Sequence, residues 1–310
     1  MNKILAVGLS STIQKTIVVP GFTLDRVNRA TEYLLDASGK AVNAARVLNQ
    51  LEEGCVSCVS PLGEENALLF LDLASRDRLP VDWVTVPGRT RYCYTCVDPG
   101  AGTTTELVVD EPVDRGAAAV ERFASAADET LSATARLLPG VDALLFAGSR
   151  PKAWPDDTVA RICGLAKDAG KTLVADFHGR DLALTLERCV PDVIKINEEE
   201  FCSTFGYPYP LGADELRGRI AEKSAEYANA IVITRGSKDT YAGYLGVSFT
   251  HSVKAVKAVN ATGCGDSFTA GFLHSWLAVR DMEAALETGS RCATRNALNL
   301  RCGSIRDPND

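Results

Sequence analysis

The chain has 310 residues, of which 46% are hydrophobic and 24% charged, and its formal net charge is −7. This composition is typical of a globular protein, and the acidic balance argues against a nucleic-acid partner, which requires a basic surface. No apolar run approaches the roughly 20 residues of a membrane span, and the apolar start is too short for a signal peptide. We therefore expect a cytoplasmic protein with no membrane association.

Apolar segments with the lengths of buried strands alternate with segments of helical periodicity. Strands are predicted at residues 3–9, 55–60, 143–148, 171–177, 192–197 and 230–236. Helices are predicted at residues 39–53, 64–77, 113–138, 156–170, 212–228 and 264–280. Because several strands are apolar nearly throughout, we expect them to be covered on both faces. The alternation predicts an α/β fold with a mostly parallel central sheet and helices on both faces.

Two β-rich segments, at about residues 10–36 and 84–110, interrupt this alternation. Both contain turn signals and many Thr, Tyr and Val residues, which favour strands. We expect them to form one small sheet over an edge of the main sheet, within a single domain of residues 1–310. Such a sheet has an exposed edge and an apolar face, which predicts a homodimer contact through residues 16–19 and 93–97.

Two cysteine pairs, Cys55/Cys58 and Cys93/Cys96, have a spacing that can bind zinc. Both pairs fall in predicted strands, where residues three apart point to opposite faces. Neither pair could then hold one metal ion without a turn. We interpret these cysteines as reduced and structural.

The segment "VNATGCGDSFTAGF", residues 259–272, predicts an anion pocket at a helix start. Gly263 and Gly265 allow successive N–H groups to converge, and the helix that begins near Cys264 adds its dipole. The dipole should lower the pKa of Asp266, which still suits phosphoryl transfer, because the alcohol loses its proton late. The same letters fit a plain helix cap, and the spacing alone does not decide between the two.

Two further motifs lie at predicted helix starts. In residues 37–51, a Ser-Gly-Lys turn that ends at Lys40 runs into a helix, and we expect the first turn of that helix to face outward with Asn43. Lys40 and Asn43 could bind hydroxyls or a phosphate at this helix start. In residues 195–201, Asn197 and Glu200 would share one face of a helical turn and could hold hydrated Mg²⁺ through waters. Ordinary solvated helix starts explain both motifs equally well.

Together the three motifs resemble the ribokinase-like family of carbohydrate kinases, also called the phosphofructokinase-B family. Its G-G-K-G-x-N pattern is matched at residues 38–43, its N-x-x-E pattern at Asn197 to Glu200, and its D-T-x-G-A-G-D pattern at residues 260–266. The order and distances agree over essentially the whole chain, with the two β-rich segments in the place of the family's lid. The resemblance implies a ribokinase-like fold and ATP-dependent phosphorylation of a sugar hydroxyl.

The resemblance also implies roles for individual residues. Asp266 would be the base, and Asn197 and Glu200 would act on Mg²⁺ and the phosphates. The anion hole would consist of the N–H groups of Thr262, Gly263, Cys264 and Gly265. Nucleotide contacts are expected from Thr234, Arg235, Gly236 and Asn296. The family relation admits a monovalent cation near the anion hole.

Several local strings, including residues 27–51 and 89–98, resemble the branch that phosphorylates ketose phosphates, such as 1-phosphofructokinases and tagatose-6-phosphate kinases. The acceptor would then be fructose 1-phosphate, fructose 6-phosphate or tagatose 6-phosphate. Lys40, Arg91 and Ser149 are placed to hold the substrate phosphate. The expected substrate-binding residues are Gln14, Gly39, Lys40, Asn43, Arg91 and Ser149.

The positions expected to face the sugar depart from the branch pattern. Gln14 stands where the branch has an Asp that grips sugar hydroxyls, and Ser38 and Ala41 replace glycines of the lysine turn. The alternatives are a kinase for an unphosphorylated sugar, a nucleoside or a cyclitol, and a non-catalytic sugar or nucleotide sensor. A nicotinamide-dependent dehydrogenase is disfavoured, because no G-x-G-x-x-G follows the first strand.

Overall fold

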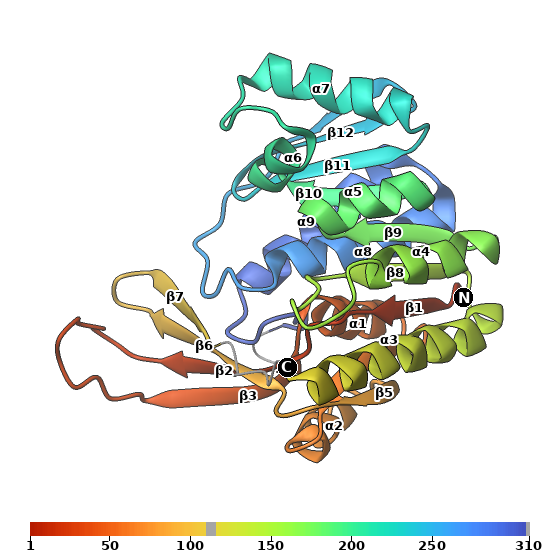
Figure 1. The fold of residues 1–310 in the computed structure, drawn as a ribbon. Helices are drawn as coiled ribbons and strands as arrows, with labels where there is room; N and C mark the ends of the chain where they lie inside the picture. The colour runs from red at the N-terminus through yellow and green to blue at the C-terminus, as the bar shows by residue number, and fades with distance from the viewer. Residues whose placement is uncertain (110–115, 308–310) are drawn as a thin grey trace.

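The computed structural model describes residues 1–109 and 116–307. A nine-stranded sheet with the order β13-β12-β11-β10-β9-β8-β1-β4-β5 runs through the molecule, and a four-stranded sheet with the order β3-β2-β6-β7 projects from one side (Figure 1). The main sheet is parallel except at one end, where β11 pairs with β12 and β12 with β13 in antiparallel fashion. The predicted α/β fold with a mostly parallel sheet is confirmed.

The main sheet contains β1 (Ile4–Val7), β4 (Val56–Gly63), β5 (Val81–Val86), β8 (Ala143–Ala147), β9 (Thr172–Asp176), β10 (Val193–Asn197), β11 (Ala230–Arg235), β12 (Lys238–Tyr244) and β13 (Val247–His251). The small sheet contains β2 (Thr12–Val18), β3 (Glu32–Ser38), β6 (Arg91–Asp98) and β7 (Thr103–Val108). The helices are α1 (Lys40–Leu51), α2 (Ala67–Ser75), α3 (Ala117–Leu137), α4 (Thr158–Asp168), α5 (Gly179–Arg188), α6 (Glu198–Phe205), α7 (Ala213–Glu226), α8 (Cys264–Val279) and α9 (Met282–Ala297).

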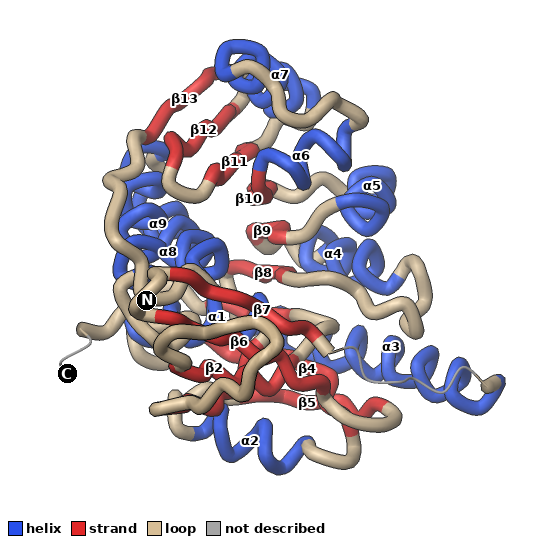
Figure 2. The backbone as a smooth tube through the Cα atoms, turned by 90° about the vertical axis from the view of Figure 1, so that its left-hand side faces the viewer, coloured by secondary structure: helices blue, strands red, loops and turns tan. Residues whose placement is uncertain are grey.

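Helices cover both faces of the main sheet and create two hydrophobic cores. Successive side chains of β1 point to opposite faces, so Ile4 and Ala6 enter one core while Leu5 and Val7 enter the other. The first core packs against α1, α2, α8 and α9, and the second against α3 to α7. Figure 2 shows α8 and α9 on one side of the sheet and α4, α5 and α6 on the other.

The small sheet differs in its boundaries from the predicted insertions. We expected the second insertion to start near residue 84, but β5 pairs in parallel with β4 and belongs to the main sheet. Only β6 and β7 contribute from that insertion, and its last residue, 110, lies outside the described residues. The expectation was wrong because β5 is a partly exposed edge strand with polar residues, a pattern that also fits a small exposed sheet.

All ten cysteines are free thiols. Within the described ranges, no cluster of three or more His, Cys, Asp or Glu side chains is placed to hold a metal ion. Cys93 is buried on one face of β6 while Cys96 is half-buried on the other, as the strand pattern predicts. In the same ranges, no helix has both the length and the apolar character needed to cross a membrane.

Candidate active site

A cavity of about 610 Å³ lies at the carboxyl edge of the parallel strands, between the main sheet and the small sheet. In open parallel sheets this edge is the usual place for a ligand, because the loops after the strands converge there. Among the residues that line it are ten of the predicted site residues: Gln14, Gly39, Lys40, Asn43, Arg91, Ser149, Glu200, Thr262, Gly263 and Asp266. The three motifs, far apart in the sequence, therefore meet in one cavity.

The glycine turn before α8 has a backbone that other residues would not tolerate. Gly263 has φ 82°, in the left-handed region that favours glycine. A Cβ atom at this position would lie 2.5 Å from the Sγ atom of Cys302 and 2.9 Å from the backbone nitrogen of Gly303. Both the dihedral angle and the close packing therefore require glycine here.

The predicted anion hole is only partly available to a ligand. The N–H of Thr262 donates to the side chain of Asn260 at 3.0 Å, and the N–H of Cys264 donates to the backbone oxygen of Ala261 at 3.2 Å. Those two groups therefore hold the turn itself. Neither described backbone nor described side-chain atoms accept from the N–H groups of Gly263 and Gly265, which also lie at the N-terminus of α8. They are the donors that remain for an anion.

Asp266, in the first turn of α8, is only 7% exposed and lines the cavity. The side chain of Asn43 donates to its Oδ2 atom at 2.8 Å. Burial and the neighbouring charge of Asp176 raise the pKa of Asp266, although Lys40, Asn43 and Lys195 oppose the rise. The expected low pKa is therefore wrong, because loss of hydration and a second carboxylate outweigh the helix dipole. A carboxylate with a raised pKa is a stronger base.

A second buried carboxylate, Asp176 at the end of β9, binds two lysines. Its side chain lies 3.3 Å from the Nζ atom of Lys40 and 3.2 Å from that of Lys195, and accepts a hydrogen bond from Thr269. Burial alone would raise the pKa of Asp176, but the two lysines outweigh it and lower the pKa to about 2. The charge of Asp176 in turn raises the pKa of Lys40. The site thus contains a carboxylate that is ionised at neutral pH and that favours the charged form of Lys40.

Sequence reasoning missed Asp176 and Lys195. The available signals were a carboxylate at the end of a predicted strand and a lysine inside another, "VIKIN". A charged side chain in a strand that is covered on both faces needs a buried partner, and here each residue is the partner of the other.

Asn43 does not face outward, as its place in the first turn of α1 suggested. It is buried, and its side chain contacts Ser38 and Arg46 as well as Asp266. Helical periodicity identifies the polar side of a helix but cannot show that a neighbouring helix covers it. Here α8 packs against α1 and buries that polar side.

Asn197 and Glu200 form a reciprocal capping box at the start of α6. The N–H of Glu200 donates to Oδ1 of Asn197 at 2.8 Å, and the N–H of Asn197 donates to Oε2 of Glu200 at 2.9 Å. The other carboxylate oxygen of Glu200 lies 3.8 Å from Lys40 and 3.6 Å from His178. Glu200 therefore caps the helix and also lines the cavity, whereas Asn197 is exposed and its oxygen is occupied by the cap.

The four expected nucleotide contacts are not among the residues that line the described part of the cavity. Thr234 and Gly236 lie at and just beyond the end of β11. Arg235 forms an ion pair with Glu198 at 2.8 Å and lies over the ring of Tyr241. These contacts occupy the Arg235 side chain within the protein.

Asn296 in α9 is fully buried, which does not fit a direct nucleotide contact. Its Oδ1 atom accepts from the N–H of Gly303 at 2.7 Å, and its Nδ2 atom donates to the backbone oxygen of Thr262 at 2.9 Å. Asn296 therefore holds the glycine turn before α8 in place. The polar pattern "CATRNAL" in the sequence could not show on which side of α9 the amide lies.

The cavity also contains polar residues that sequence reasoning did not single out, and they follow β9 or lie on β7. They are His178, Arg180, Asp181 and Glu106. Asp181 forms an ion pair with Arg150 at 2.9 Å, which ties the loop after β8 to α5. Gln14 is buried on the inner face of the small sheet and donates to Thr95 at 2.7 Å.

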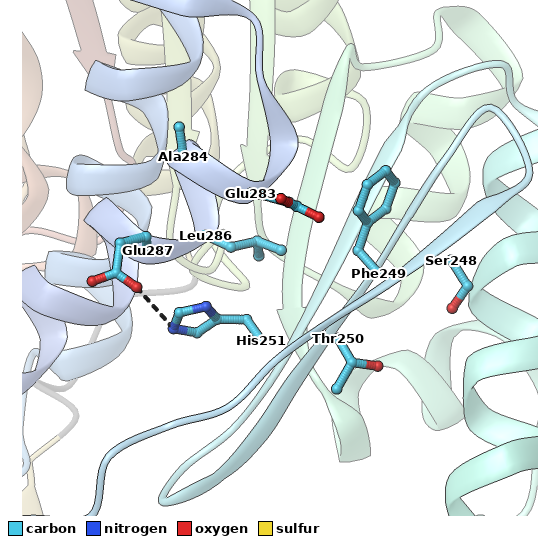
Figure 3. A pocket seen from close by; sticks show the side chains of 8 residues that line it. All are labelled: Ser248, Phe249, Thr250, His251, Glu283, Ala284, Leu286 and Glu287. Carbon is cyan, nitrogen blue, oxygen red and sulfur yellow. Dashed lines mark ion pairs between the residues drawn. The ribbon is translucent and has the colours of Figure 1, made fainter.

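A second hollow, of about 590 Å³, lies between β13 and α9 and contains no predicted site residue. Figure 3 shows the side chains that line it, with His251 directed toward Glu287. The Nε2 atom of His251 lies 3.9 Å from the carboxylate of Glu287, and that carboxylate is largely exposed. This hollow has neither a glycine turn nor a buried carboxylate among its lining residues, so we place the active site in the first cavity.

The fold and the cavity define a carbohydrate kinase. The model of the "pfkB family carbohydrate kinase" matches residues 1–307, and the chain therefore belongs to that family. The predicted family membership is confirmed.

Individual relatives agree with this assignment. A 1-phosphofructokinase of Rhodobacter capsulatus is 30% identical over 284 residues, which cover 88% of this chain and 83% of the relative. A tagatose-6-phosphate kinase of Staphylococcus epidermidis is 25% identical over 303 residues, 97% of this chain and 94% of the relative. The tetrameric inhibited form of phosphofructokinase-2 from Escherichia coli has the same fold, with a TM-score of 0.82 and 17% identity over 96% of this chain and 95% of that one.

Proposed function

We propose that the protein is a sugar-phosphate kinase, which transfers the γ-phosphoryl group of ATP to a hydroxyl of a ketohexose phosphate. The observation that carries the proposal is the buried Asp266 carboxylate, which shares one cavity with the glycine turn, Lys40 and Arg91. The names of the two relatives, a 1-phosphofructokinase and a tagatose-6-phosphate kinase, favour a phosphorylated acceptor.

In this reaction the acceptor hydroxyl attacks the γ-phosphorus and loses its proton to Asp266. The bond from that phosphorus to the β–γ bridging oxygen breaks, and ADP leaves. The free N–H groups of Gly263 and Gly265 at the start of α8 would stabilise the oxygens of the transferring group. Lys40, which Asp176 keeps charged, would neutralise part of the negative charge. The remaining work of the site is positioning.

The residues around Glu200 fit a magnesium ion held through waters. One carboxylate oxygen of Glu200 is not used by the capping box and lies on the cavity side near Lys40. Mg²⁺ commonly keeps several waters and binds one carboxylate together with the substrate phosphates. When bound with ATP, the ion would neutralise phosphate charge. Asn197 would act only by holding Glu200 in place.

For the acceptor phosphate we propose Arg91 and Ser149, with Arg180 as an additional cation at the same cavity. A guanidinium group can donate two parallel hydrogen bonds to a phosphate, which gives both affinity and orientation. Gln14, on the inner face of the small sheet, would contact the sugar hydroxyls. Because Gln14 carries no charge, the hydroxyl pattern it prefers can differ from that of an Asp.

An ADP-release assay with a panel of acceptors tests this function. We expect ketose phosphates to exceed unphosphorylated sugars, nucleosides and cyclitols in kcat/KM, because only they engage Arg91. Arg91→Ala should raise KM for the best phosphorylated acceptor at least about tenfold, the value of one charge-assisted hydrogen bond. Equal rates for phosphorylated and unphosphorylated acceptors, with Arg91→Ala unchanged, would contradict the proposal.

We also propose that the small sheet mediates a homodimer. Tyr33 and Leu107 are exposed apolar side chains of β3 and β7. In the sheet, Leu107 lies opposite Tyr94 of β6, so these apolar groups belong to neighbouring strands. Thr16 and Thr95, within the two predicted contact segments, are buried and cannot contribute. The contact would therefore use only the outward half of each segment.

A further inference from the structure

We propose that Arg46 and Ser38 are positioning residues for Asp266, and that they act through the amide group of Asn43. This inference rests on the proposed role of Asp266 as the base. The side chains form one chain of hydrogen bonds. Oδ1 of Asn43 accepts from Oγ of Ser38 at 2.9 Å and from Nη1 of Arg46 at 3.3 Å. On the other side, Nδ2 of Asn43 donates to Oδ2 of Asp266 at 2.8 Å.

Arg46 determines which way the Asn43 amide points. A guanidinium group only donates hydrogen bonds and an ionised carboxylate only accepts them. Asn43 can therefore satisfy Arg46 and Asp266 together in one orientation alone. If the amide were turned over, its NH₂ group would face the guanidinium and its oxygen would face the carboxylate. The Ser38 hydroxyl, which can donate or accept, adds a second hydrogen bond to the correct orientation.

The consequence for Asp266 is that its two oxygens differ. Oδ2 is held by Asn43, whereas the described residues donate no hydrogen bond to Oδ1. Because Asp266 lines the cavity, Oδ1 is the oxygen that can take the proton of the acceptor hydroxyl. A fixed Oδ2 also fixes the plane of the carboxylate, which general-base catalysis requires.

Arg46 itself is held rigidly. Its side chain is 1% exposed and lies 2.7 Å from Oδ2 of Asp77. It also donates to the backbone oxygens of Cys302 and Ala37. Asp77 in turn pairs with Arg301 at 2.7 Å. A guanidinium group with this many partners cannot rotate away, so it can impose its orientation on Asn43.

Paired charges around Arg46 also support the rigidity of its guanidinium group. Arg301 also pairs with Asp36 at the end of β3, at 2.7 Å. The four side chains, Arg46, Asp77, Arg301 and Asp36, therefore contain two positive and two negative charges. Each charge in the cluster has an oppositely charged partner, so a member that left it would leave a buried charge unpaired.

Several other charged or titratable groups face Asp266 and interact with it in addition to Asn43. They are the carboxylate of Asp176, the ammonium groups of Lys40 and Lys195, and the thiols of Cys264 and Cys302. Among the groups that keep the pKa of Asp266 from rising further is the hydrogen bond from Asn43. A misplaced Asn43 should therefore raise this pKa, whereas a general loss of stability should not.

The test is the titration of the Asp266 carboxyl group, followed by ¹³C NMR and assigned by the signal missing from Asp266→Asn. We expect the pKa of Asp266 to rise by about half a pH unit in Ser38→Ala and by about one in Arg46→Lys. In the pH profile of kcat/KM, the acid limb should move to higher pH by the same amount as the pKa of Asp266. Ser60→Ala is the matched control, because it removes a buried serine hydroxyl that makes no hydrogen bond to the described residues. We expect no change there.

A double-mutant cycle decides whether the effect passes through Asn43. In the Asn43→Ala background, Ser38→Ala should leave the Asp266 pKa unchanged, because the link is already broken. An unchanged pKa in Ser38→Ala alone, or an equal rise with and without Asn43, would overturn the inference. Arg46→Lys replaces a buried group and can fail to fold. In that case Ser38→Ala alone still tests the inference. The titration needs no turnover, so full activity of Asp266→Asn would refute only the proposed base.

Discussion

At the scale of single residues, the site depends on two buried carboxylates with opposite properties. Asp176 is 1% exposed but pairs with two lysines, and its pKa falls to about 2. Asp266 is nearly as buried but has no direct cationic partner among the described residues, and its pKa rises. Two carboxylates whose environments separate their pKa values can take different roles at the same pH. Asp176 supplies a fixed charge, and Asp266 is suited to accept a proton.

We predict that Asp266→Asn abolishes turnover but stabilises the fold. Loss of a general base should lower kcat at least about 100-fold. Since the folded-state pKa of Asp266 is raised, the stability it contributes is present below the unfolded pKa and is lost as the pH rises through the folded one. At neutral pH the ionised group therefore destabilises the fold, and Asp266→Asn should raise the free energy of unfolding. Urea unfolding at pH 7 and an ADP-release assay measure both effects.

The corresponding change at Asp176 should have the opposite effect on stability. Asp176→Asn removes the ion-pair partner of the buried Lys195 and leaves Lys40 only its longer contact with Glu200, which should cost about 3 kcal/mol of unfolding free energy. With a folded pKa near 2 and an unfolded pKa near 3.9, wild-type stability from this group is complete above about pH 4 and declines as the pH falls toward 2. Urea unfolding at pH 3 and pH 7 tests both statements; equal stability of Asp176→Asn and wild type at pH 7 would contradict them.

At the scale of elements, helix starts form most of the site. The first turns of α1, α6 and α8 all reach the cavity, and α1, like α8, follows a glycine with a positive φ angle. α6 begins with a capping box, and α8 begins with a left-handed glycine whose carbonyl accepts from Ser267. These helix starts direct N–H groups and side chains toward the same cavity. An unstructured loop could do so only at a larger cost in conformational entropy.

We predict that Gly263→Ala is more damaging than an alanine at an equivalent but open position. At Gly263 the added Cβ would meet Sγ of Cys302, and at Gly170, also left-handed with φ 67°, it would meet nothing within 4 Å. Gly170→Ala should cost about 1 kcal/mol from the backbone alone. Gly263→Ala should cost about 1 to 3 kcal/mol more and reduce kcat, because the start of α8 must shift. Thermal unfolding and kcat of both variants provide the comparison, and equal losses would show that the close packing is unimportant.

At the scale of the whole molecule, the active-site cavity depends on two sheets of different construction. The main sheet has a core on each face, whereas every residue of β7 in the small sheet is exposed. β2 and β6 are partly covered, whereas Leu107 of β7 and Tyr33 of β3 are the exposed side chains that a second copy would cover in the proposed dimer.

We predict that Leu107→Asp converts the proposed dimer to a monomer. Leu107 is 53% exposed in β7, so the monomer loses little when it becomes polar, whereas a buried charge in an interface is costly. Val279→Asp is the matched control, since Val279 is 59% exposed at the end of α8, outside the small sheet. Light scattering after size-exclusion chromatography should give half the mass for Leu107→Asp alone. A wild-type mass of one chain would contradict the proposed dimer.

The sequence by itself determined the fold class and most of the cavity. Short apolar runs identified the strands and a period of 3.6 residues identified the helices, and the alternation of the two predicted the parallel sheet. These patterns can be read from the sequence because they follow from local geometry and burial. The segments that it missed lack long apolar runs. α5 and α9 are amphipathic, β12 contains polar residues and a glycine, and β13 is a largely exposed strand at the end of the sheet.

Only the tertiary structure decided the electrostatics and the direction of the side chains. The pKa of Asp266 rises because the group is buried and because Asp176, 90 positions earlier in the chain, lies nearby. Asn43 turns inward and Asn296 becomes a buried support because neighbouring helices cover them. Charge interactions and burial depend on distances through space, which no local pattern of residues contains. The sequence thus indicated many residues of the candidate site but not Asp176 or Lys195, while packing determined protonation, orientation and which side chains line the cavity.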